Sequence, residues 1–96
     1  MRIRFLTVAR DELRDAVKFY NSQQPGLGAR FKTEVRAALS RIRANPTAWQ
    51  SMSAHSRRCL TGRFPYGVIY QVRDDEIVIV AVAHLHRQPE YWHTRQ

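Results

Sequence analysis

The sequence predicts an α+β fold of the order β-α-α-β-β-β, in which a helical hairpin packs on a small, mainly antiparallel sheet. Two amphipathic segments in the first half are separated only by a turn at Pro25-Gly26, and helices joined so closely lie antiparallel. In the second half, Tyr66–Arg73 and Glu76–His84 are rich in β-branched and aromatic residues and flank the polar pair Asp74-Asp75, as in a β-hairpin. Residues 1–96 are enough for one domain with a single modest core.

The chain opens with a short strand and a helix. Residues 2–7 alternate basic and apolar side chains, which is typical of a strand with one buried face. Thr7 or a neighbour is expected to cap the helix that follows, with Asp11 and Glu12 near the positive end of its dipole. Apolar residues then recur at i, i+3, i+4 and i+7 and define a buried face: Leu13, Ala16, Val17 and Tyr20.

A second helix is expected to start near Leu27 and to end at Asn45-Pro46. It carries one apolar stripe, made of Phe31, Val35, Ala38, Leu39 and Ile42. Neither helix is apolar enough to be stable alone, so both are expected to lie on the sheet. Residues 47–56 have no periodicity and predict a loop, from which Trp49 is expected to pack back onto the fold.

Three strands complete the predicted sheet: residues 56–61, Tyr66–Arg73 and Glu76–His84. The last of them is apolar on both faces, so it is expected to be a central strand that is covered on both sides. The first strand of the chain is expected to pair beside it. By simple alternation, His84 shares a face with every second residue before it: Val82, Val80 and Val78.

The charge of the chain predicts an anionic partner. Sixteen basic residues oppose eight acidic ones, giving a net charge of +8, and fourteen of the sixteen are arginine, which binds phosphate and carboxylate in a bidentate manner. The single cysteine, Cys59, cannot form an internal disulfide, which fits a reducing cytoplasm. Neither a run of about 20 apolar residues nor a secretory signal is present in the sequence, so no membrane association is expected.

Several short motifs are spread over the whole chain in a specific order and spacing. They are Pro25-Gly26-Leu27-Gly28 followed by Phe31, Asn45-Pro46 followed by Trp49, Arg57-Arg58, Phe64-Pro65-Tyr66-Gly67-Val68 with Tyr70, and His84-x-x-Arg87-x-Pro89-x-Tyr91-Trp92. In this combination the chain resembles the RelE/ParE superfamily of type II toxin–antitoxin toxins, and within it the ParE-like branch. The resemblance implies a small toxin that an acidic, partly disordered antitoxin wraps and neutralises in a hetero-oligomer.

The resemblance leaves two activities open. ParE-like toxins inhibit DNA gyrase by binding and are not known to perform chemistry of their own, whereas RelE-like toxins cut messenger RNA on the ribosome. Ribonucleases of this superfamily tend to carry an arginine in the third strand, where this chain has only Tyr70 and Gln71 before Arg73. The gyrase inhibitor is therefore favoured over an enzyme. A third alternative is an inactive relative that binds its antitoxin and represses its own operon with it.

Two sets of residues are candidates for the functional site. A protein partner is expected to contact arginines and aromatic residues at the rim of the sheet and on the first helix: Arg57, Arg58, Arg63, Arg87, Tyr91, Trp92, Arg10 and Arg14. RNA cleavage would instead need cations beside the developing phosphorane and groups that move protons, which Arg57, Arg63, His84, Arg87 and Tyr91 could supply, with His86 as a further proton carrier.

Structural roles compete with these functional ones. His84 ends a buried strand and is expected to form a local hydrogen bond, and Tyr91-Trp92 is expected to pack on the fold as a C-terminal clamp. Arg87 can meet an acidic partner or brace the segment around Tyr91. His84, His86 and His93 match no standard zinc spacing, so neither a metal nor a cofactor is expected.

Overall fold

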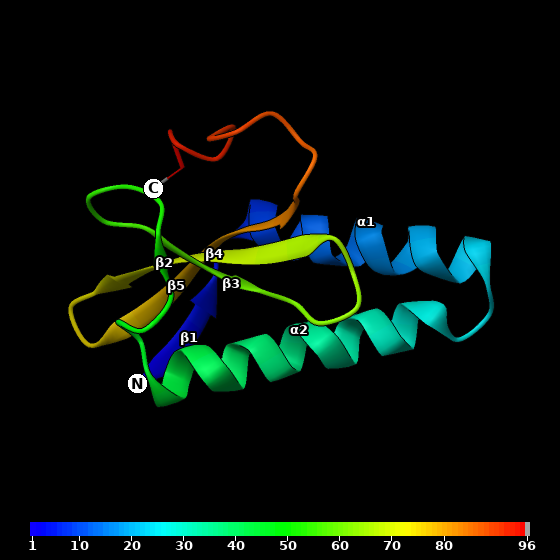
Figure 1. Cartoon of the computed structure of the whole chain (residues 1–96), viewed down its shortest axis with the longest axis horizontal. Coiled ribbons are helices and arrows are strands. Elements are labelled where there is room, and N and C mark those ends of the chain that lie inside the picture. Colours follow the sequence, from blue (N-terminus) through cyan, green and yellow to red (C-terminus); the bar gives the residue numbers. More distant parts are fainter. Residues whose placement is uncertain (96) are drawn as a thin grey trace.

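A computed structural model describes residues 1–95 (Figure 1). The chain forms strand β1 (Arg2–Phe5), helices α1 (Thr7–Gln23) and α2 (Leu27–Ala44), and strands β2 (Gln50–Ser51), β3 (Arg57–Leu60), β4 (Tyr66–Arg73) and β5 (Glu76–His84). The predicted α+β fold is confirmed, and β4 and β5 have the predicted bounds. Within the described residues, neither helix is long and apolar enough to cross a membrane.

The five strands form one sheet in the order β1-β5-β4-β3-β2. β1 runs parallel to β5, from Arg2 opposite Glu76 to Phe5 opposite Ile79, and the other neighbours are antiparallel. A parallel neighbour needs a crossover connection, which the helical hairpin supplies. β5 therefore lies inside the sheet beside the first strand, as predicted.

The segment 47–56, predicted to be a loop, contains the short edge strand β2. Gln50 of β2 lies opposite Arg58, and Ser51 lies opposite Arg57. Both residues of β2 are exposed, so no buried face imposes the apolar alternation by which a strand is recognised in a sequence.

The helical hairpin depends on a close approach at Gly28. The Gly28 amide donates a hydrogen bond to Oδ1 of Asn21 (2.8 Å). A Cβ atom at this position would lie 2.5 Å from the carbonyl oxygen of Val17, so only glycine lets α1 and α2 meet here. At the other end of α2, Trp49 packs against the core and its Nε1 donates to the carbonyl oxygen of Arg41 (3.2 Å), as predicted.

The start of α1 differs from the prediction. Leu6 holds the N-cap position, and no side chain makes a cap hydrogen bond there. Asp11 and Glu12 lie beyond the first turn, where the helix dipole stabilises a carboxylate little. The carboxylate of Glu12 instead accepts a hydrogen bond from the backbone of β5, as described below.

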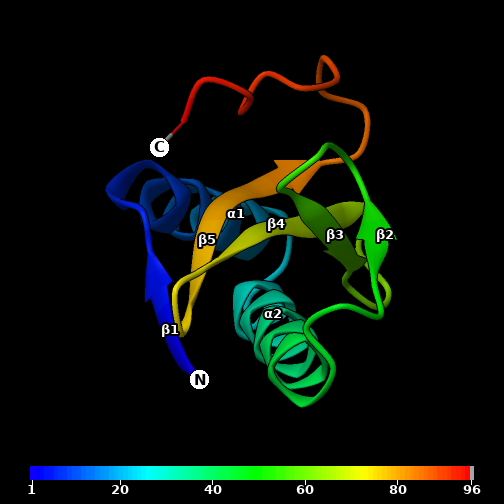
Figure 2. The ribbon, with the colours of Figure 1, turned by 90° about the vertical axis from the view of Figure 1, so that its left-hand side faces the viewer.

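Two layers cover the sheet. α1 and α2 cover one face, over a core made of Ala9, Ala16, Phe31, Val35, Ala38, Ile42, Cys59, Val68, Tyr70, Ile77, Ile79 and Val82. Residues 85–95, which we call the tail, pass over the other face, where Trp92 packs with Ile69, Val80, Ala81 and Ala83. Figure 2 shows the tail and α2 on opposite sides of the strands. The predicted burial of β5 on both faces is confirmed.

Candidate functional site

A β-bulge in β5 decides which side chains reach each face of the sheet. Ile69 of β4 pairs with Ala81, whereas the next residue, Tyr70, pairs with Ile79. Val80 is therefore an extra residue on β5, and it shifts the alternation of every side chain that follows. After the bulge, each side chain of β5 therefore points to the face opposite to the one that regular alternation would give it.

The shifted alternation corrects the predicted face of His84. Val80 belongs to the tail-side cluster, whereas Val82 belongs to the helix-side core. His84 lies opposite Tyr66 of β4, and the two rings meet edge to face with their centroids 5.1 Å apart. His84 thus shares the helix side with Val82, and the prediction that Val78 and Val80 lie on that face is wrong.

The bulge lies where β5 loses its neighbour β1. Pairing with β1 ends at Ile79, so the edge of β5 is open beyond that residue. The Val82 amide donates to Oε1 of Glu12 (3.0 Å), and the Val80 carbonyl oxygen accepts from Nη1 of Arg95 (3.1 Å). Side chains from the two ends of the chain therefore satisfy backbone groups that a further strand would otherwise pair.

Glu12 joins α1, β5 and the tail. Its Oε1 and Oε2 accept hydrogen bonds from Nη1 (2.9 Å) and Nη2 (3.0 Å) of Arg95, a bidentate arrangement. Oε2 also accepts from the Tyr91 hydroxyl (2.6 Å) and lies 3.6 Å from Nη1 of Arg87. The side chains of Glu12 and Arg95 are only 13% and 15% exposed, so water screens their attraction less than at the surface. We call Glu12, Arg87, Tyr91 and Arg95 the Glu12 hub.

Tyr91 is held as a proton donor within this hub. Its ring lies between two guanidinium groups, with the Cζ atom of Arg87 at 3.9 Å and that of Arg95 at 4.9 Å from the ring centroid. Burial raises the pKa of the Tyr91 hydroxyl, and the hydrogen bond to Glu12 and the Glu12 charge raise it further, against a lowering by Arg95 and Arg87. Tyr91 therefore keeps its proton near neutral pH, which makes it unsuited to act as a general base.

The tail packs as the sequence predicts. Trp92 is 4% exposed, and Arg87 stacks on Tyr91, which confirms the expected clamp and brace. The Trp92 ring is correspondingly withdrawn from the surface, so in this structure it offers a partner almost no contact area. Its role in partner binding stays a prediction, and within this structure the ring packs in the fold.

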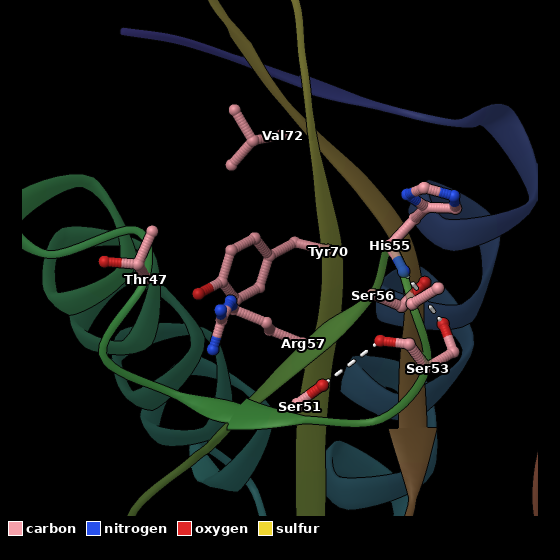
Figure 3. A pocket seen from close by; sticks show the side chains of 9 residues that line it. Thr47, Ser51, Ser53, His55, Ser56, Arg57, Tyr70 and Val72 are labelled. Carbon is pink, nitrogen blue, oxygen red and sulfur yellow. Dashed lines mark hydrogen bonds between the residues drawn. The ribbon is translucent and has the colours of Figure 1, made fainter.

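Arg57 and Arg58 point to opposite faces of the sheet, as alternation along a strand predicts. Nη1 of Arg57 donates to the Trp49 carbonyl oxygen (2.8 Å), and the side chain lies beside Tyr70 in a hollow (Figure 3). Arg58 lies across Gly67, where a Cβ atom would come within 2.8 Å of its Cγ and Cδ. Its Nε is buried without a hydrogen-bond partner in the described part of the chain.

The other predicted arginines lie far apart in the fold. Arg63 is exposed in the β3–β4 turn with a φ of 67°, beside the first turns of α2. On α1, the Cζ atom of Arg10 lies 5.6 Å from the centroid of the Phe5 ring, and Arg14 pairs with Asp11. These side chains are solvated and available to a partner.

The five residues of the ribonuclease alternative do not all share one hollow. Arg57 lines the hollow beside Tyr70, and Arg63 lines the one at α2. His84, Arg87 and Tyr91 line one hollow at the start of the tail, and His84 and Arg87 also line a second hollow beside Glu12. Tyr91 faces Glu12 within the hub. Arg57 and Arg63 therefore lie away from the hollow of His84, Arg87 and Tyr91, and the five side chains do not all surround one point at which a phosphate could react.

The histidines are likewise divided. Nδ1 of His84 accepts a hydrogen bond from the His86 amide (3.0 Å), which confirms the expected local bond, and the two rings lie 5.1 Å apart. His93 lies instead beside Trp92, with 6.1 Å between ring centroids. Within residues 1–95, no three His, Cys, Asp or Glu side chains are grouped so as to hold a metal ion.

Sequence reasoning missed Glu12 and Arg95 as site residues. A signal for Glu12 was present, because it lies between Ala9 and Ala16 on the helical face that becomes buried. A carboxylate on a buried face requires a charged or hydrogen-bonding partner. For Arg95 no such signal exists, since its partners are distant in sequence and the tail has no periodic pattern.

Comparisons with known proteins agree with this fold. The family model described as the ParE toxin of the type II toxin–antitoxin system, parDE, matches residues 3–89. A solved structure from the chromosomal ParDE toxin–antitoxin system of P. aeruginosa superimposes with a TM-score of 0.78 at 18% identity, covering 90% of this chain and 97% of that one. The search of curated proteins yielded no significant match. The predicted ParE-like branch is confirmed, and the chain belongs to the ParE toxin family of type II toxin–antitoxin systems.

Proposed function

We propose that this chain is a cytoplasmic toxin that inhibits DNA gyrase by binding to it, and that a cognate acidic antitoxin neutralises it in a hetero-oligomer. Membership of the ParE toxin family supports the toxin–antitoxin part. One observation carries the choice of a binding inhibitor over a ribonuclease. Arg57 and Arg63 line hollows separate from the one that His84, Arg87 and Tyr91 share, and the Tyr91 hydroxyl keeps its proton and donates it in a hydrogen bond to Glu12.

The rim at the end of β5 is the surface that best suits a protein target. Arg58 and Arg87 line one hollow there, and half of the Arg87 side chain is exposed. Two large apolar side chains, Leu85 and Leu60, are 39% and 48% exposed. Arginine next to accessible apolar groups is typical of the residues that dominate binding at protein interfaces.

The antitoxin is proposed to use the broader positive surface. A net charge of +8 attracts an acidic chain over several ångströms and accelerates its association. The candidate contacts are Arg10 and Arg14 on α1, Arg57 on β3, and Arg63 in the β3–β4 turn. Association with the antitoxin should therefore slow markedly as the salt concentration rises.

Inducible expression without an antitoxin tests the function. We expect growth arrest with induction of the SOS response, and inhibition of purified gyrase in a supercoiling assay. Rapid loss of translation with cleaved transcripts would overturn this proposal in favour of the ribonuclease alternative. An absence of toxicity would indicate the inactive relative that only binds its antitoxin.

Matched variants test the binding surface. Arg58→Gln and Arg87→Gln are each expected to weaken gyrase inhibition about tenfold, since truncated interface arginines often cost more than 1 kcal/mol. Arg36→Gln removes the same charge from an exposed position of α2 and should change inhibition less than about twofold. Equal losses in all three variants would show that only the total charge matters.

A further inference from the structure

A second polar surface lies away from the rim, around the open end of β4. It consists of two hollows of about 200 Å³ and about 390 Å³. The hollows share four residues, Ser53, His55, Ser56 and Val72, so they adjoin each other. We call the two together the basic groove. Figure 3 shows its smaller half, with Arg57 and Tyr70 at one side and the segment that carries Ser51 and Ser53 forming a wall.

The groove differs from the other hollows in its charge. No carboxylate is among the residues that line either half, whereas Glu90, Glu34, Glu12 and Asp15 line the remaining three. The larger half carries basic side chains from three segments, namely His55, Arg73, His93 and Arg95, of which Arg95 is already paired with Glu12. The smaller half carries Arg57 and hydroxyl groups from Thr47, Ser51 and Ser53. Asp74 and Asp75 follow Arg73 in the next turn but line neither half.

A chain of hydrogen bonds orients Arg73, which lines the larger half. The Ser56 side chain is buried, at 1% exposed, and its Oγ accepts from Nε2 of Gln71 (2.9 Å). Oε1 of Gln71 in turn accepts from Nε of Arg73 (2.8 Å). This chain uses only Nε of the guanidinium, and within residues 1–95 its terminal nitrogens make no hydrogen bond. Those two donors are the pair that binds a phosphate in a fork.

We propose that the basic groove binds a small phosphate ester of about nucleotide size. The phosphate lies in the larger half, against the terminal nitrogens of Arg73 and the rings of His55 and His93. The polar organic part lies in the smaller half, against the hydroxyl groups of Thr47 and Ser51, with Val72 as an apolar contact between them. The combined volume falls within the range of small-molecule sites. This ligand is separate from gyrase and antitoxin, and its binding does not depend on toxicity.

Titration of the ¹⁵N-labelled full chain tests this assignment. Inorganic phosphate and adenosine monophosphate are added at constant ionic strength, and amide shifts are followed. We expect saturable shifts in residues 53–56 and 71–73, with the nucleotide binding about tenfold more tightly because it occupies both halves. Arg73→Gln and His93→Gln should each weaken both probes about tenfold, provided that their spectra and melting temperatures match the parent. His93 is exposed in the tail, so its variant stays informative if Arg73→Gln folds poorly.

Arg36→Gln serves as the charge-matched control and should alter either affinity less than about twofold. The absence of saturable shifts with both probes would overturn the proposal. So would equal weakening by Arg36→Gln, because binding would then follow total charge. Phosphate and nucleotide of equal affinity would overturn the assignment of the organic part. Shifts seen only with a single-stranded oligonucleotide would identify a nucleic-acid surface in place of a small-ligand site.

Discussion

The two faces of the sheet are covered by different means. On the helix face, large apolar side chains such as Phe31 and Tyr70 are fully buried between regular elements. On the tail face, a smaller apolar cluster around Trp92 is covered by a segment with neither helix nor strand. Such a segment has no backbone ladder of its own, so the burial of Trp92 and the side-chain bonds to Glu12 hold it in place. The helix face therefore carries most of the stability, and the tail face carries a locally separable structure.

The largest expected effect is on the helix face. Phe31→Ala should lower the free energy of unfolding by about 4 kcal/mol, because it removes a buried ring and leaves a cavity between α2 and the sheet. Chemical denaturation measures this loss. Leu60→Ala, at a residue 48% exposed, is the control and should cost less than about 1 kcal/mol. Similar costs for both variants would show that the helix face is not the main source of stability.

The next largest effect is expected from a variant of the Glu12 hub, which tests whether the tail can open while the helix face stays folded. Glu12→Ala should cost about 3 kcal/mol, because it leaves the Arg95 guanidinium and the Val82 amide without their partner. Hydrogen exchange should accelerate first in residues 85–95, while amides of β4 remain protected. Asp15→Ala removes a neighbouring, exposed carboxylate of α1 and should leave the tail protected. Uniform acceleration over the whole chain would mean that the tail and the helix face unfold together.

Alkaline pH gives a smaller effect on the same hub. Burial raises the pKa of all four tyrosines from their ordinary value of 10.0, so the folded chain holds these protons more tightly than the unfolded chain. Stability is therefore fully present below about pH 10 and declines as the pH rises above it. Tyr91→Phe should cost about 1 kcal/mol at pH 8 and make the alkaline decline shallower.

Tyr20→Phe provides the matched control for this measurement. Tyr20 packs in the aromatic cluster of the helix face, and its hydroxyl makes no side-chain hydrogen bond within residues 1–95. At pH 8, Tyr20→Phe should lower the free energy of unfolding less than Tyr91→Phe does. Equal losses would argue against a special contribution from the bond between Tyr91 and Glu12.

The smallest effect is expected at the surface of α1. Arg14→Ala breaks the exposed pair with Asp11 and should cost less than about 0.5 kcal/mol, because solvent screens such pairs. Thermal unfolding at low and high salt measures the difference. If the variant nevertheless weakens antitoxin binding, Arg14 serves the partner and not the fold. A large loss of stability would contradict the solvated character assigned to this face.

The local pattern of residues determined the regular elements of this protein. Amphipathic periods at Leu13–Tyr20 and Phe31–Ile42 placed the two helices, and the β-branched runs placed β4 and β5. These patterns arise because each element buries one face or both, so neighbours along the chain record the burial. The family resemblance rests on the same elements and is confirmed over residues 3–89.

Tertiary structure alone decided the candidate site. The bulge at Val80 reversed the face assigned to His84, and no residue type in β5 marks where an extra residue is inserted. Arg95 and Glu12 meet across 83 positions of the chain, so neither local periodicity nor composition records their bond. The helical periodicity around Glu12 marks a carboxylate on a buried face but does not identify its partner, because tails pair through distant side chains that no local pattern records.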